Sequence, residues 1–205
     1  MIISIEGPDF VGKNTLVELV LEQAKKVSNK TFKVLQFPNN DTDIGRMLRK
    51  KLLDKNWQEE DGIIFQLLNT AHRYEYLADI KEAKNQEDYI LIIIRYNLSG
   101  PVYASVDGLN ATKVWELYSW FDEYLPDITF IITRDFKVEA LAKEREPDHY
   151  ETESKQEKVR KIYDLAETLW GDRLGKVFKV VNNGKMENTV KNMFDLLKQE
   201  IGIQE

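Results

Sequence analysis

Hydrophobic positions along the chain form two kinds of pattern: short apolar runs, and longer stretches in which apolar residues recur at helical spacing. The short runs predict β-strands, and they cover residues 2–6, 32–37, 89–94, 128–133 and 177–181. The helically spaced stretches predict helices over about 14–27, 42–53, 58–84, 112–124, 138–143, 155–170 and 186–201. Strands and helices therefore alternate along most of the chain.

This alternation predicts an α/β fold in which a five-stranded parallel sheet is flanked by helices. The run at 89–94 is rich in isoleucine, which is typical of a central parallel strand covered on both faces. We expect it to lie beside the first strand. Ligands of such sheets bind at the carboxyl ends of the strands. No repeat or linker interrupts the order, so residues 1–205 are expected to form one domain.

Charge and composition exclude several classes of function. The chain has 35 acidic and 29 basic side chains and a net charge of −6, so no overall positive field attracts a nucleic acid. The absence of cysteine excludes disulfides and thiol chemistry, and two histidines are few for a zinc enzyme. The apolar start is too short for a signal peptide, and no run is long enough to span a bilayer. We therefore expect a cytoplasmic protein with no nucleic-acid partner and no membrane partner.

A glycine-rich segment follows the first strand. Gly7 and Gly12 frame four residues and Lys13 follows, which matches the pattern G-x-x-x-x-G-K. In this loop backbone N–H groups face phosphate oxygens, and the lysine reaches the β and γ phosphates. The alternative is a plain strand-to-helix turn. We expect a nucleoside triphosphate, ATP, to be bound by this loop and the first helical turn, namely Gly7, Pro8, Asp9, Phe10, Val11, Gly12, Lys13, Asn14 and Thr15.

The residue after the lysine departs from the pattern. Ser or Thr is usual there, because its hydroxyl binds Mg²⁺, whereas this chain has Asn14 followed by Thr15. An amide oxygen is also a hard ligand, so Asn14 could hold the metal together with phosphates and water. Asn14 could equally cap the helix, and Thr15 fits better as a phosphate contact.

Further motifs resemble those of the thymidylate kinase family from end to end. They are Asp9 in the phosphate loop, Phe37-Pro38 after the second strand, Arg73 in the long helix, Arg95-Tyr96 after the third strand, and Asp148-His149-Tyr150-Glu151 in a charged loop. The resemblance implies a three-layer P-loop kinase fold with a lid segment at about 143–154. It implies transfer of the γ-phosphoryl group of ATP to dTMP, with Mg²⁺, on the route to dTTP. Nucleotide substrates and a second copy of the chain are the implied partners.

The resemblance also implies roles on the acceptor side. Asp9 would bind the sugar 3′-hydroxyl, Phe37 would form a wall of the pocket, and Arg73 would read the acceptor edge of a pyrimidine. Arg95 would bind the acceptor phosphate, while Ser99 and Tyr103 would pack against the base and sugar. Alternatives remain open: an Asx turn for Asp9, core packing for Phe37 or Tyr103, and a solvated helix surface for Arg73.

On the donor side, the resemblance implies that cations from the lid stabilise the transferring group. Phe10 stands where one subgroup of the family has an arginine. Lys143 and Arg145 are therefore the candidates, and together with Lys13 and Arg95 they form the expected catalytic set. A solvated, charged helix end is the alternative for the two lid residues.

Four positions depart from the family pattern. Ile94 stands where an aspartate usually precedes the arginine, so with Asn14 the metal side lacks two polar groups, and Glu6 and Asp9 remain as nearby acids. Asn69 stands where an aromatic ring often stacks on thymine, and Asn40 stands where many members have another phosphate-binding arginine.

These departures keep other hypotheses open beside a dTMP kinase. One is a kinase that accepts dUMP or a 5-substituted dUMP. Another is a catalytically impaired nucleotide-binding homologue. A nucleoside kinase is weaker, because Arg95 implies an acceptor that carries a phosphate. The apolar residues Ile63, Ile64, Leu67 and Leu68 could form a homodimer face or belong to the core.

Overall fold

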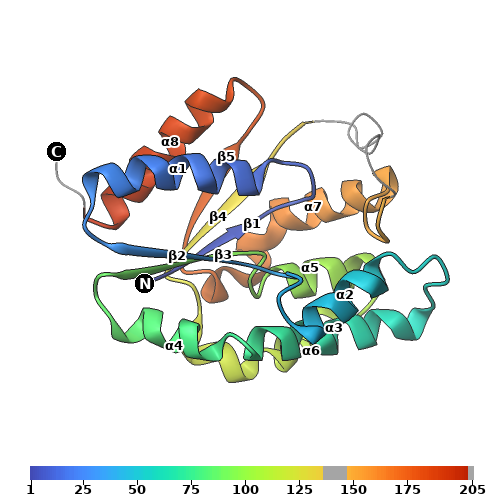
Figure 1. The fold of residues 1–205 in the computed structure, drawn as a ribbon. Coiled ribbons are helices and arrows are strands. Elements are labelled where there is room, and N and C mark those ends of the chain that lie inside the picture. Colours follow the sequence, from blue (N-terminus) through green and yellow to red (C-terminus); the bar gives the residue numbers. More distant parts are fainter. Residues whose placement is uncertain (136–146, 203–205) are drawn as a thin grey trace.

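A computed structural model describes residues 1–135 and 147–202 and shows a five-stranded sheet between two layers of helices (Figure 1). The strands are β1 (Ile2–Glu6), β2 (Thr31–Gln36), β3 (Tyr89–Ile94), β4 (Ile128–Thr133) and β5 (Lys176–Val181). Their order is β2-β3-β1-β4-β5, and all neighbours are parallel. The predicted α/β fold is confirmed, including the place of β3 beside β1.

The central strands divide their side chains between two cores. Successive side chains of a strand point to opposite faces, so Ile3 and Ile5 pack in one cluster and Ile2 in the other. The first cluster lies under α1 (Lys13–Val27) and α8 (Met186–Glu200), which lie together on one face of the sheet (Figure 1). Burial on both faces explains why β1 and β3 are apolar runs rather than alternating ones.

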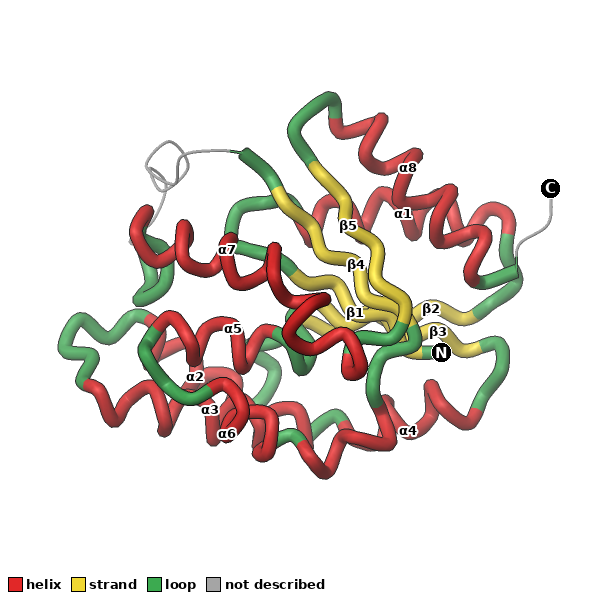
Figure 2. The backbone as a smooth tube through the Cα atoms, turned by 180° about the vertical axis from the view of Figure 1, so that it is seen from behind, coloured by secondary structure: helices red, strands yellow, loops and turns green. Residues whose placement is uncertain are grey.

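The other face carries the remaining helices, and Figure 2 shows most of them gathered on that side of the sheet. They are α2 (Asp43–Leu52), α3 (Glu59–Tyr74), α4 (Leu77–Asn85), α5 (Ser99–Val106), α6 (Ala111–Leu117), α7 (Glu153–Trp170) and the 3₁₀ segments Ser119–Tyr124 and Gly171–Arg173. None of the helices in the described ranges combines the length and apolar character that a membrane crossing requires.

The prediction of one helix over 58–84 was wrong. The helix is interrupted at Glu75 and Tyr76, so that α3 and α4 are two separate helices. The Tyr76 hydroxyl donates to Asn39 Oδ1 at 3.1 Å, and its ring packs edge-on against Phe37 at 5.5 Å. Because these contacts come from the loop after β2, helical periodicity could not predict the break.

Helix α5 was not predicted. Seven of its eight residues are buried, so it has no polar face and no amphipathic pattern. The predicted helix at 112–124 consists of α6 followed by a 3₁₀ segment. The predicted helix at 138–143 lies outside the described residues.

Candidate active site

The loop from Gly7 to Gly12 joins β1 to α1 at the carboxyl edge of the sheet. Gly7 and Gly12 have φ values of 133° and 84°, which favour glycine. A Cβ on Gly7 would lie 2.1 Å from the carbonyl oxygen of Ile132, so a side chain has no room there. Phe10 also has a positive φ of 61°, which is uncommon for a residue with a side chain. The loop therefore has the special backbone that its glycine spacing indicated, directly before a helix N-terminus.

Lys13 folds its ammonium group back over this loop. It donates to the carbonyl oxygen of Gly7 at 2.9 Å and to that of Pro8. Burial, followed by the nearby charge of Arg95, lowers the pKa of Lys13 well below its ordinary value. Lys13 and Arg95 thus line the same cavity, and an anion bound there would be attracted to both.

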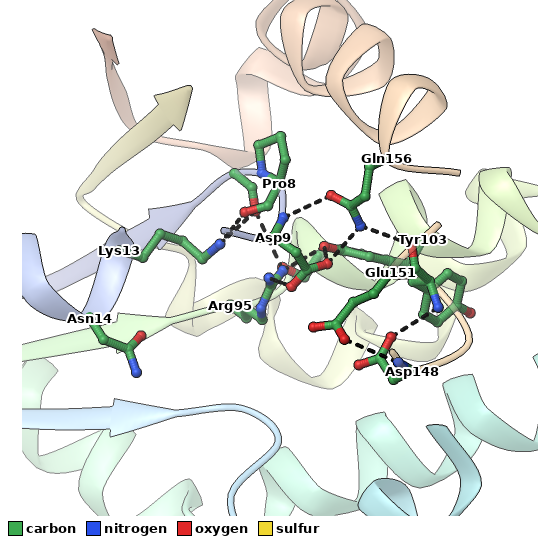
Figure 3. A network of polar contacts seen from close by, with 12 residues as sticks. Pro8, Asp9, Lys13, Asn14, Arg95, Tyr103, Asp148, Glu151 and Gln156 are labelled. Atoms are coloured by element: carbon green, nitrogen blue, oxygen red, sulfur yellow. Dashed lines mark hydrogen bonds and ion pairs between the residues drawn. The ribbon is translucent and has the colours of Figure 1, made fainter. Parts of the chain in front are cut away.

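Asp9 and Arg95 form an ion pair at the centre of the site (Figure 3). The Tyr103 hydroxyl and Gln156 Nε2 each donate to Asp9 Oδ2 at 2.8 Å. Burial acts to raise the pKa of Asp9, but the charges of Arg95 and Lys13 outweigh it and the pKa is lowered. Asp9 therefore stays ionised at neutral pH and fixes the position of the guanidinium.

Beneath the pair, Glu6 is fully buried and accepts three hydrogen bonds from hydroxyl groups. Ser99 donates at 2.6 Å, Ser4 at 3.0 Å and Tyr163 at 3.1 Å. The Ser99 hydroxyl is therefore engaged with Glu6 rather than directed only at the pocket. Ile94 packs in the apolar core on the α1 side of the sheet.

A pocket of about 510 Å³, its open mouth included, lies beside this pair. Its lining brings together every residue predicted for the acceptor, namely Asp9, Phe37, Asn69, Arg73, Arg95, Ser99 and Tyr103. We call it the acceptor pocket. Asn40 lies outside it, and its carbonyl oxygen accepts from Arg46 at 2.9 Å.

A second, more polar hollow of about 740 Å³ adjoins the acceptor pocket, and we call it the phosphate hollow. From the loop and first helical turn it is lined by Asp9, Phe10, Gly12, Lys13, Asn14 and Thr15. The side chain of Val11 is instead fully buried in the core, while its carbonyl oxygen accepts from Asn182 at 2.9 Å. The two cavities share Asp9, Phe37, Pro38, Arg49, Arg95 and Asp148 as a common wall.

Arg49 of α2 was missed in the sequence. Its exposed side chain lines both cavities and has no hydrogen-bond or ion-pair partner among residues 1–135 and 147–202. It stands three residues before Leu52, which also lines the acceptor pocket, so the two share a helix face. The position of Arg49 on the same helix face as Leu52 could have indicated that it lines the pocket. The three other basic residues of α2 made Arg49 hard to distinguish by sequence.

Gln156 of α7 was also missed, and nothing in the sequence links it to Asp9, 147 residues away. Its side chain contacts Asp9 twice, because Oε1 also accepts from the Asp9 backbone N–H at 2.9 Å. Only the fold brings α7 to the phosphate loop.

Asp148, Tyr150 and Glu151, which belong to the predicted lid segment, line the two cavities. Asp148 donates its backbone N–H to Glu151 at 3.0 Å (Figure 3). Burial, with the negative charges of Asp9 and Glu151, raises the pKa of Asp148 to about 7. His149 stacks on Trp57 at 3.7 Å and lies 3.0 Å from Asp107. The motif is thus anchored to Trp57 and to Asp107 at the end of α5, whereas Lys143 and Arg145 lie outside the described residues.

Oxygen donors for Mg²⁺ are present but do not form a cage. Within the described ranges no group of three or more His, Cys, Asp or Glu residues is arranged to hold a metal. Asn14, Asp9 and Glu151 line the phosphate hollow and offer hard oxygen ligands. Asn14 also donates to Gln36 at 2.8 Å. This donor set fits an ion held mainly by phosphates and water.

Comparisons with known proteins agree with this geometry. The model of the thymidylate kinase family matches residues 5–192. Thymidylate kinase from Caldicellulosiruptor saccharolyticus is 29% identical over 204 residues, which cover 97% of this chain and 94% of that protein. The enzyme from Schizosaccharomyces pombe is 30% identical, with 96% and 90% covered. The solved structure of Candida albicans thymidylate kinase has the same fold, with a TM-score of 0.70 at 22% identity over 99% of this chain and 93% of that one.

Proposed function

This chain belongs to the thymidylate kinase family and is a nucleoside monophosphate phosphotransferase, and from that premise we propose that it transfers the γ-phosphoryl group of ATP to dTMP. The observation that carries the proposal is the wall that the two cavities share. Asp9 and Arg95 line both the acceptor pocket and the phosphate hollow. An acceptor phosphate at that wall would lie next to the donor's terminal phosphate, as in-line transfer requires.

On the donor side, the loop backbone and Lys13 would bind the phosphates of ATP. The left-handed residues Phe10 and Gly12 shape the loop before the N-terminus of α1, where N–H groups favour an anion. Lys13 would exchange the carbonyl oxygens of Gly7 and Pro8 for phosphate oxygens. The lid cations Lys143 and Arg145 would add positive charge at the transferring group.

On the acceptor side, Arg95 and Arg49 would bind the 5′-phosphate. Arg95 is held by Asp9 and by the Tyr103 hydroxyl at 2.8 Å, so its guanidinium is preorganised. Arg49 would supply the charge that Asn40 lacks. Phe37 and Tyr103 would form apolar walls around the sugar and base.

Bound Mg²⁺ would neutralise charge on the phosphate oxygens, with Asn14, Asp9 and Glu151 as the protein groups placed to hold it or its waters. The chain's own residues would do the rest by positioning. Buried walls would exclude water, and fixed cations would stabilise charge that shifts during transfer.

The range of acceptor bases in this proposal is set by the identity of residue 69. Because an aromatic ring is replaced by an amide there, the proposal includes dUMP and 5-substituted dUMP as acceptors beside dTMP. The competing proposal of an impaired nucleotide binder rests on Asn14 and Ile94, which leave the metal side with few polar groups.

A panel of acceptors tests these proposals. Initial rates of ADP release would be measured with ATP, Mg²⁺ and each of dTMP, dUMP, 5-hydroxymethyl-dUMP, dCMP, dGMP and thymidine, for the natural chain and for Lys13→Met. We expect turnover on dTMP that the Lys13 variant lacks. Equal rates for the two proteins would contradict the role of Lys13. Binding of dTMP without turnover under several divalent metals would favour the impaired binder.

A homodimer is the proposed assembly. Ile63, Ile64 and Leu67 on the outer face of α3 expose 52%, 47% and 50% of their surface, whereas Leu68 packs against the core. An apolar stripe of this kind on a helix favours burial against a partner.

A further inference from the structure

Three polar side chains share the inner face of α3. Gln66, Asn69 and Arg73 are three and four residues apart, which places them on one helix face, and all three line the acceptor pocket. Their exposed fractions are 1%, 6% and 1%. Buried polar groups are normally hydrogen-bonded. Their partners within the protein therefore show what each can still offer a ligand.

Arg73 is largely engaged with the protein itself. Its NH1 donates to the Asn69 backbone oxygen at 2.9 Å and to Asn69 Oδ1 at 3.3 Å. Its NH2 donates to the carbonyl oxygens of Arg95 and Tyr96 at 2.9 and 2.7 Å. A guanidinium has five N–H donors, and the remaining one, on Nε, has no partner among the described residues. Arg73 can therefore offer a base a single donor, not a two-pronged fork.

Asn69 and Gln66 differ in how far their side-chain amides are hydrogen-bonded within the protein. Asn69 donates its amide nitrogen to the Phe65 carbonyl oxygen at 3.1 Å and accepts from Arg73, so both ends of its amide are engaged. For Gln66, neither Oε1 nor Nε2 finds a hydrogen-bond partner in the part of the chain that the structure describes. Gln66 thus brings a free acceptor and a free donor to the acceptor pocket.

We propose that Gln66 is a specificity-determining residue that reads the base of the acceptor nucleotide. This inference rests on the proposed function. The pairing edge of thymine or uracil presents a carbonyl oxygen, the N3–H group and a second carbonyl oxygen. Gln66 Oε1 accepts from N3–H while Nε2 donates to one neighbouring carbonyl oxygen, and the Arg73 Nε–H suits the other.

The two residues then divide the discrimination between bases. A carboxamide can turn to match either N3–H of thymine or the bare N3 of cytosine, so Gln66 alone does not separate them. Arg73 only donates, so it favours a keto oxygen over the amino group of cytosine. Gln66 instead makes the pocket sensitive to whether N3 can form a hydrogen bond at all.

Replacing Gln66 by methionine tests the assignment, because Gln66→Met removes the amide and keeps an unbranched side chain of similar length. Initial rates would be compared for dTMP, dUMP and N3-methyl-dTMP. Two lost hydrogen bonds predict a fall of roughly ten- to a hundredfold in kcat/KM for dTMP and dUMP. N3-methyl-dTMP can form only the carbonyl bond of the two, so the two proteins should differ on it by a smaller factor, roughly two- to tenfold. The KM for ATP should not change.

The free protein supplies a second readout. Because Gln66→Met replaces an unpaired buried amide with an apolar group, it should keep or raise the Tm of the free protein. It should also reduce the rise in Tm that dTMP gives the natural chain. Thr70→Val is the matched control. Its hydroxyl lies on the same helix, donates to the Gln66 carbonyl oxygen at 3.0 Å and lines neither cavity, so kcat/KM should be unchanged.

An equal loss on all three acceptors would mean a structural role for Gln66, and unchanged kinetics would mean no role, so either result overturns the assignment. A natural chain that turns over none of the acceptors would instead contradict the proposed function. Calorimetric titration of dTMP into both proteins then decides the role of Gln66. Equal affinities, or binding by neither protein, would refute it.

Discussion

Arg95 illustrates how a single residue can join the fold to the site. Its N–H still donates to the Ile5 carbonyl oxygen at 3.0 Å, as a member of the sheet would, but its φ of 64° turns the chain out of β3. A left-handed conformation costs a residue with a side chain roughly 1–2 kcal/mol. The surrounding contacts offset that cost, since Asp9, Tyr103 and Gly7 all bond to the guanidinium.

Arg49 carries a prediction at the same scale. A hydrogen bond between charged groups contributes roughly 1.5–3 kcal/mol, so Arg49→Met should raise the KM for dTMP about ten- to a hundredfold. The KM for ATP should change less. Arg46→Met is the control, because Arg46 lies one turn earlier on α2, pairs with Asp43 at 2.5 Å and lines neither cavity. An unchanged KM for dTMP in the Arg49 variant would remove it from the site.

Asp148 carries a prediction about pH. Its pKa is raised from 3.8 to about 7, so the folded state favours the neutral carboxyl group. The penalty for ionisation is absent at low pH, grows between the two values and is complete above about 7. Asp148→Asn should therefore raise the free energy of unfolding at pH 8, and the gain should shrink toward pH 4. Denaturant unfolding at both pH values measures this.

The same ionisation should affect acceptor binding. Below about pH 7 the neutral Asp148 adds no negative charge to the common wall, whereas above it the carboxylate repels a phosphate. Affinity for dTMP should weaken from pH 7 to 8.5 in the natural chain and stay nearly level in Asp148→Asn. Parallel pH profiles for the two proteins, or lost activity in the variant, would indicate that Asp148 acts in another way.

At the scale of elements, the sequence predicted what depends on local pattern. The five strands and helices α1, α2, α7 and α8 carry clear periodicity, and the glycine spacing of the phosphate loop reflects a backbone need. Helix α5 was missed because burial on all sides removes the polar face that periodicity detects. The end of α3 was missed because Tyr76 and Asn39 fix it through a contact across the fold.

The residues of the candidate site also divide into those that the sequence predicted and those that it did not. Arg95 and Phe37 follow strands directly, so strand prediction and the family motifs located them, whereas Lys13 was located by the glycine spacing of the phosphate loop. Gln66 was not found, because a glutamine inside a helix has no local signature of burial. The burial of its amide, without a hydrogen-bond partner among the described residues, depends on the fold and not on the local sequence.

The outer face of α3 supports a prediction at the scale of the whole molecule. Leu67→Glu should convert the proposed homodimer to a monomer, because a buried unpaired carboxylate is costly at an interface. Sedimentation equilibrium measures the mass directly. Leu169→Glu on α7 is the control, since Leu169 is exposed to 53%, close to the 50% of Leu67, and lies on another helix. A natural chain that sediments as a monomer would contradict the proposed assembly.

The common wall between the two cavities links the two substrates energetically. Asp9, Arg49, Arg95 and Asp148 face both the acceptor pocket and the phosphate hollow, so occupation of one cavity changes the field in the other. By thermodynamic reciprocity, ATP must alter the affinity for dTMP by the same factor by which dTMP alters the affinity for ATP. The two nucleotides therefore act as effectors of each other: repulsion between their phosphates weakens joint binding, and any rearrangement of the shared residues that one nucleotide makes for the other strengthens it.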